Sequence, residues 1–122
     1  MTDIYRSIYQ KMKKMGILDV KQYAVIENPP YVPLCIDRLS QDTYALSQNP
    51  VVDGLMVADP DIEVRVDHGE ETAEPLVCLS RETKKVVYPA PGKVNLAVRN
   101  ELSAFLDRWL SDLIAQGSNR YQ

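Results

Sequence analysis

The chain has 122 residues and a formal net charge of −3, with 45% apolar and 25% charged residues, as in an ordinary globular protein. This length predicts a single domain over residues 1–122, large enough to bury a hydrophobic core. A sequence pI near 5.1 argues against nucleic acid and anionic membranes as main partners, because phosphate binding requires clustered Lys and Arg.

The cysteines and the apolar runs indicate in which cellular compartment we expect the protein. Cys35 and Cys78 lie in apolar, strand-like runs and form no C-x-x-C pair, so the zinc and thioredoxin signatures are absent. Buried thiols are typical of a reducing compartment. The first residues do not form a signal peptide, and no apolar run approaches the ~20 residues that a membrane span needs. We therefore expect a cytoplasmic protein.

The first half of the chain predicts one helix and a hairpin of two strands, with a candidate third strand over 23–26. Apolar side chains recur every three or four residues over 3–15, which indicates a helix that ends at Gly16. A short strand over 23–26 precedes a proline-rich surface loop, and segments 34–39 and 43–47 form a hairpin. Segment 51–58 is apolar, and its pattern fits either a strand broken by Gly54 or a loop that covers the sheet.

The middle of the chain has strict alternation. Ile62, Val64 and Val66 recur with period two, which predicts a strand over 62–68 with one apolar and one charged face. A turn over 68–72 leads to a second strand over 76–80. Because Pro75 lacks an N–H, we expect it at the first strand position or on an edge. Segment 85–88, before the break at 89–92, is a candidate for one more strand.

The C-terminal segment 94–116 predicts the longest helix, with Asn95 as N-cap and Gly117 as the stop. Its apolar stripe follows the i, i+3, i+4, i+7 rule: Leu102, Phe105, Leu106, Trp109, Leu110, Leu113 and Ile114. Both aromatic residues of this stripe are expected in the core. The fold class is therefore α+β: an antiparallel sheet of four to five strands, flanked by the N-terminal helix and by the longer C-terminal helix across one face.

The polar groups around the single histidine form the candidate site. His68 shares its parity with the apolar residues of the strand, so its ring is expected on the core side. Arg65 and Asp67 share the other face, close enough to pair. The candidate patch comprises Arg65, Asp67, His68, Glu70, Glu71 and Glu74. An imidazole among carboxylates suits either acid–base chemistry or a polar contact surface.

Two functions follow from this patch. No nucleotide-binding, nucleophile-elbow or zinc-protease motif occurs, so we expect a non-catalytic accessory or protein-binding module without a cofactor or metal. The alternative is a small hydrolase-like or metal-dependent enzyme using His68 with Glu70 or Glu74. The catalytic residues and the protein partner are left unassigned, and a homodimer through a sheet edge is a further possibility.

The second half of the chain resembles the YqiB-like proteins, a bacterial domain-of-unknown-function family. The resemblance covers about residues 43–117 and rests on Pro60-Asp-Ile-Glu-Val-Arg-Val66, His68, Ala73-Glu74, Tyr88-Pro89, Lys93, Glu101, Phe105-Leu106, Trp109-Leu110 and Ala115-Gln-Gly117. The family has Tyr and Asp beside the histidine, where this chain has Asp67 and Gly69. The resemblance implies a compact cytosolic bacterial protein and marks Arg65, His68 and Glu74 as matching polar positions.

Overall fold

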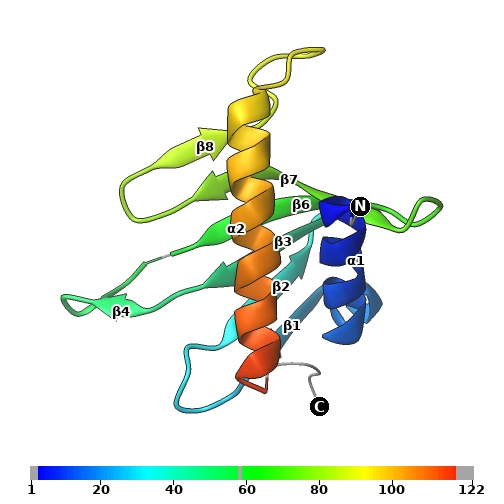
Figure 1. Cartoon of the computed structure of the whole chain (residues 1–122). Helices are drawn as coiled ribbons and strands as arrows, with labels where there is room; N and C mark the ends of the chain where they lie inside the picture. Colours follow the sequence, from blue (N-terminus) through cyan, green and yellow to red (C-terminus); the bar gives the residue numbers. More distant parts are fainter. Residues whose placement is uncertain (1–2, 58, 118–122) are drawn as a thin grey trace.

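The computed structural model describes residues 3–57 and 59–117. In chain order its elements are α1 (Ile4–Lys14), the 3-10 helix η1 (Ile17–Asp19), β1 (Tyr23–Ile26), β2 (Leu34–Arg38), β3 (Thr43–Gln48), β4 (Val51–Val52), β5 (Leu55–Met56), β6 (Asp61–Asp67), β7 (Thr72–Leu79), β8 (Lys84–Val86) and α2 (Leu96–Ala115). The α+β class is confirmed (Figure 1). None of the helices in these ranges has the length and apolar character needed to cross a membrane.

The main sheet has the strand order β1-β2-β3-β6-β7-β8, and every neighbouring pair is antiparallel. It contains six strands, so the prediction of four to five was too low. The difference arises at the edges, where the short strands β1 and β8 both pair with a longer neighbour. The β4–β5 hairpin forms a separate two-stranded unit.

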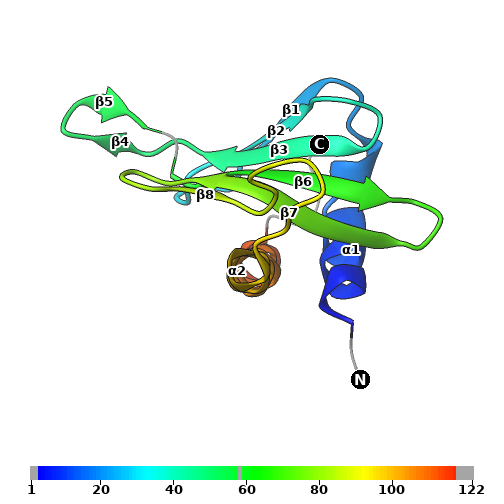
Figure 2. The same cartoon turned by 90° about the horizontal axis from the view of Figure 1, so that it is seen from above.

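Both helices lie on one face of this sheet (Figure 2). Successive strand residues point to opposite faces, so each strand sends one set of side chains under the helices. The fully buried set on this covered face includes Ile36, Leu46, Ile62 and Val64. Together with α1 and α2 they form one continuous core cluster. The alternation predicted over 62–68 therefore corresponds to β6, whose apolar side chains point to the covered face.

Strand β7 is longer than predicted, because it begins at Thr72 rather than at residue 76. Pro75 pairs with Val64 inside this strand, next to an irregularity where the register with β6 shifts. Pro75 is therefore not the first residue of the strand, but it lies where β7 is unpaired on one side, as the edge alternative predicts. The position tolerates proline because β8 pairs only with Val77–Leu79, so β7 is covered on one side alone at Pro75.

Helix α2 is close to the predicted element. Asn95 caps it by accepting a hydrogen bond from the Val98 N–H at 3.1 Å. Trp109 is 9% exposed, as expected for a core residue, and its indole N–H donates to the Gln48 side-chain oxygen at 3.0 Å. Phe105 is 39% exposed, so its assignment to the core was wrong. Its ring instead stacks on Trp109, with the ring centroids 5.9 Å apart.

Helix α1 explains which side of α2 is buried. Asp107 of α2 accepts hydrogen bonds from the Ser7 hydroxyl and the Lys11 ammonium, each at 2.7 Å. Ser103, one turn before Asp107, is 1% exposed. The polar side of α2 that sequence periodicity predicts for solvent is therefore partly covered by α1. Ser103 is buried on the side of α2 that faces α1. Phe105 lies outside this contact and remains exposed.

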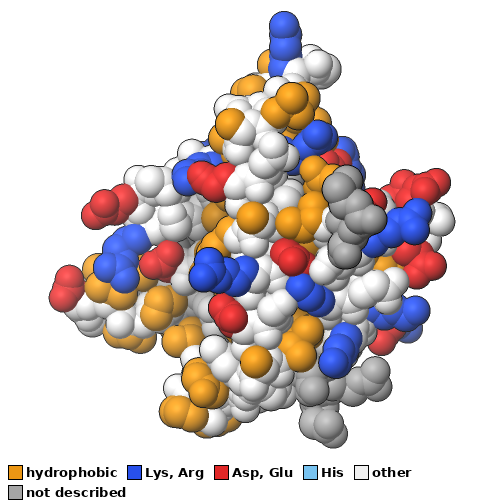
Figure 3. Space-filling model, in the orientation of Figure 1, with side chains coloured by type: hydrophobic (Ala, Val, Ile, Leu, Met, Phe, Trp, Pro, Cys, Tyr) orange, Lys and Arg blue, Asp and Glu red, His pale blue; other side chains and the backbone are white. Residues whose placement is uncertain are grey.

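The β4–β5 hairpin projects away from the sheet (Figures 1 and 2). Its turn residues Asp53 and Gly54 have φ values of 52° and 79°, as a two-residue hairpin turn requires. Val51, Leu55 and Met56 are 67%, 69% and 74% exposed. Figure 3 shows hydrophobic side chains gathered at this side of the molecule. Segment 51–58 is thus a hairpin up to Met56, and residue 58 lies outside the described residues.

Candidate functional site

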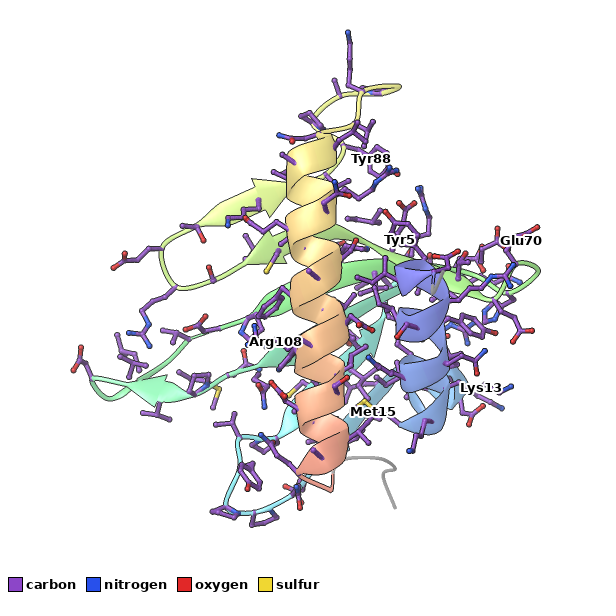
Figure 4. All side chains as sticks on the ribbon, in the orientation of Figure 1. Tyr5, Lys13, Met15, Glu70, Tyr88 and Arg108 are labelled. Carbon is purple, nitrogen blue, oxygen red and sulfur yellow. The ribbon has the colours of Figure 1, made fainter. Side chains whose placement is uncertain are left out.

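A cleft of about 730 Å³ lies where β6 turns into β7, and residues from the first turns of both helices also line it. We call it the β6–β7 cleft. Its lining residues are Tyr5, Gln41, Asp42, Arg65, Val66, Asp67, His68, Thr72, Ala73, Glu74 and Arg99. The lining includes four of the six predicted patch residues but not Glu70 or Glu71. Figure 4 shows Glu70 at the tip of the β6–β7 turn, beyond α1.

Arg65 and Glu74 form a cross-strand ion pair on the cleft wall. The Tyr88 hydroxyl donates to the second Glu74 oxygen at 2.8 Å, and the Arg65 guanidinium lies 5.4 Å from the centroid of the Tyr88 ring. The hydrogen bond to Glu74 raises the pKa of Arg65 above its ordinary value. The predicted partner of Arg65 was Asp67, and this was wrong, because directly opposite residues of paired strands lie closer than alternate residues of one strand.

His68 lies on the helix side of the sheet, as its parity predicts. Its Nδ1 atom lies 3.2 Å from the hydroxyl oxygen of Tyr9 on α1, and the two rings meet edge to face. Burial, with a contribution from the Glu71 carboxylate, raises the pKa of Tyr9. Glu71 itself accepts a hydrogen bond from the Gln10 amide at 3.1 Å. These two contacts attach the β6–β7 turn to α1.

Asp67 completes the turn, because its carboxylate accepts the Glu70 N–H at 3.0 Å. The predicted patch therefore consists of three local groups rather than one convergent cluster. Within residues 3–57 and 59–117, no hydrogen bond or ion pair joins His68 to Glu70 or Glu74. Over the same ranges no three His, Cys, Asp or Glu side chains come together as a metal-binding group.

Arg99 is a cleft residue that sequence reasoning missed. It lies in the first turns of α2, with its guanidinium carbon 5.9 Å from the centroid of the Tyr5 ring on α1. Its Nε atom is buried, and among the described residues it has no hydrogen-bond partner. Periodicity places Arg99 on the polar side of the helix, and only the position of α1 turns that side into a cleft wall. Figure 4 shows Tyr5 at the start of α1, near the upper part of α2.

A second hollow of about 300 Å³ lies on the other side of α2. Pro60, Cys78, Leu102 and Phe105 contribute to its wall, and an ion pair between Lys85 and Glu101 crosses its edge. Burial raises the pKa of the Cys78 thiol, which keeps the thiol protonated at neutral pH. Because the thiolate is the nucleophilic form, this cysteine is a packing residue rather than a reactive one.

These features define an α+β protein with an antiparallel sheet, two helices on one face and a polar cleft at the end of the sheet where β6 turns into β7. The model of the domain of unknown function DUF6908 matches residues 3–118, so the chain belongs to this family. Nothing in that match connects the chain to the YqiB-like proteins or to bacteria. No curated protein and no solved structure matches the chain.

Proposed function

We propose that this chain is a non-catalytic binding protein that receives a segment of a partner protein in the β6–β7 cleft. One observation carries the proposal: a cleft of about 730 Å³ is lined by polar side chains that are already held in fixed positions by their neighbours. Arg65, Glu74 and Tyr88 fix one another, and His68 is held by Tyr9. A cleft with positioned polar groups at its wall is the usual form of a recognition site.

The arrangement suits recognition better than acid–base catalysis. A general acid or base must reach a reacting proton and be aided by a second group. Here His68 is an exposed residue whose Nδ1 contacts a buried tyrosine, and Glu74 is engaged by two partners. Preorganised side chains lower the ordering cost of binding, which favours affinity for a partner.

The test is selection of peptides from a random library on the immobilised full-length chain. We expect selected peptides to bind the wild type and to lose binding to Thr72→Trp, which fills the cleft wall. Thr83→Trp is the matched control, because Thr83 is exposed in the β7–β8 turn at the opposite end of the strands. Peptides that bind both variants equally would place recognition elsewhere and reject the proposal.

The alternative of a hydrolase-like or metal-dependent enzyme has its own test. Zinc or manganese is titrated calorimetrically into the wild type and into His68→Ala. A binding heat that the wild type gives and the variant lacks would favour the enzyme alternative over our proposal. A cytosolic bacterial setting and the YqiB-like resemblance over residues 43–117 remain predictions from the sequence. Dimerisation through a sheet edge also remains a prediction, which size-exclusion chromatography of the full chain checks.

A further inference from the structure

The side of α2 that faces α1 carries one polar residue per turn: Arg99, Ser103 and Asp107, spaced four residues apart. Residues at this spacing share one face of a helix. Asp107 is matched by Ser7 and Lys11 of α1, at 2.7 Å each. Ser103 is small and lies buried between the matched and the unmatched ends of the row.

At the level of Arg99, α1 presents the Tyr5 ring and not a carboxylate. The ring face attracts and orients the guanidinium without accepting a hydrogen bond from it. Within the described ranges no ion pair or hydrogen bond engages the Arg99 side chain, although its Nε atom is buried. A buried donor without an acceptor is costly, and Arg99 lines the cleft, so an oxygen ligand that reached its guanidinium would be favoured.

The charges around the cleft select the kind of oxygen ligand. Besides Arg65 and Arg99, the wall carries the carboxylates of Asp42, Asp67 and Glu74. Among the described residues that line the cleft, Arg65 is already paired with Glu74, which leaves Arg99 as the cation without a partner. The remaining carboxylates repel a phosphate dianion more strongly than a single carboxylate. Arginine binds planar carboxylates through paired N–H donors, so the guanidinium suits a carboxylate ligand.

We infer that Arg99, held over Tyr5, is the binding site for a carboxylate of the partner segment, supplied by an acidic side chain. This inference rests on the proposed function and specifies the chemistry that the cleft recognises. A partner segment entering the β6–β7 cleft would place one carboxylate against the Arg99 guanidinium.

The test uses two capped tripeptides that differ in one charge, Ac-Gly-Glu-Gly-NH2 and Ac-Gly-Gln-Gly-NH2, with the full chain labelled for NMR. We expect the Glu peptide to shift the Arg99 Nε–H resonance with millimolar affinity, and the Gln peptide to bind about tenfold more weakly. Arg99→Gln should remove this preference, and Arg99→Lys should retain part of it, because the lysine keeps the charge but not the paired donors. Inorganic phosphate is titrated in parallel and should shift the resonance less than the Glu peptide.

Arg108→Gln is the matched control, because Arg108 is exposed farther along the same helix (Figure 4). It should keep the wild-type preference. Equal binding of the two peptides with shifts confined to Thr72 and Val66 would overturn the carboxylate site while leaving cleft binding intact. A larger response to phosphate would overturn the choice of ligand. The absence of shifts at Arg99 with either peptide would overturn the inference altogether, and the peptide selection would still judge the proposed function separately.

Discussion

The two faces of the main sheet are built from adjacent residues of the same strands and have opposite properties. On β6, Ile62 and Val64 are fully buried beneath the helices, while their neighbours Asp61, Glu63 and Arg65 lie on the open face. The covered face is apolar and continuous with the helices. The open face holds charges, and one pair of them forms the wall of the β6–β7 cleft. Buried apolar side chains and charged side chains thus occupy alternate positions of one strand.

The largest difference between the faces should appear when side chains are truncated on β6. Ile62→Ala removes a fully buried side chain from the core and should lower the free energy of unfolding by about 2–5 kcal/mol. Glu63→Ala, its neighbour on the open face, should change that free energy by less than about 1 kcal/mol. Urea denaturation followed by circular dichroism measures both. Equal losses for the two variants would contradict the division between the faces.

A smaller effect, of opposite sign, is expected on the covered side. Ser103 is 1% exposed, and its hydroxyl lacks a hydrogen-bond partner among the residues that the structure describes. Ser103→Ala removes this unsatisfied group and should raise the free energy of unfolding by about 1 kcal/mol. Ser111→Ala, on a less buried part of the same helix, is the control and should have little effect. A destabilised Ser103→Ala variant would show that the hydroxyl has a partner after all.

The smallest effect concerns a carboxyl group of the open face. Burial, and to a lesser extent the carboxylate of Asp37 on β2, raises the pKa of Asp61. A raised pKa in the folded state means that this group contributes stability when protonated, and that the contribution falls as pH rises from its unfolded pKa through its folded pKa. At neutral pH the charged form is therefore a small cost. Asp61→Asn should raise stability at pH 7 by less than about 0.5 kcal/mol.

The pH profile provides the control for Asp61→Asn. The gain in stability should shrink as pH is lowered through the folded pKa of Asp61, because the wild-type carboxyl group then becomes neutral as well. Thermal unfolding measured at pH 7 and at acidic pH compares the two proteins. A gain that grows toward acidic pH would contradict the raised pKa.

Periodicity alone predicted the parts of the fold whose burial depends on a single element. The alternation at Ile62, Val64 and Val66 and the stripe through Trp109 both specify a face without knowledge of neighbours. Periodicity did not decide between a strand and a loop for segment 51–58, although Asp53-Gly54 is a strong signal for a two-residue hairpin turn. Phe105 was misplaced because its exposure depends on which side of α2 is covered by α1, which no local pattern encodes.

The site was predictable only in part, for the same reason. The strand pattern singled out Arg65, His68 and Glu74, because they flank a turn at the end of a strand, and all three line the β6–β7 cleft. It did not predict their partners, since Tyr9 and Tyr88 come from segments far away in sequence. Arg99 was missed because its environment depends on the packing of two helices. When the surroundings of a residue depend on how two elements pack, the periodicity of either element alone does not predict them.

The projecting hairpin also exposes one of the described methionines to oxidants. The thioether of Met56 is 74% exposed at the hairpin, whereas Met12 and Met15 are fully buried beneath the sheet. Sulfoxide formation follows solvent access and converts an apolar side chain into a polar one. Among the three methionines that the structure describes, mild peroxide should therefore oxidise Met56 first and spare Met12 and Met15.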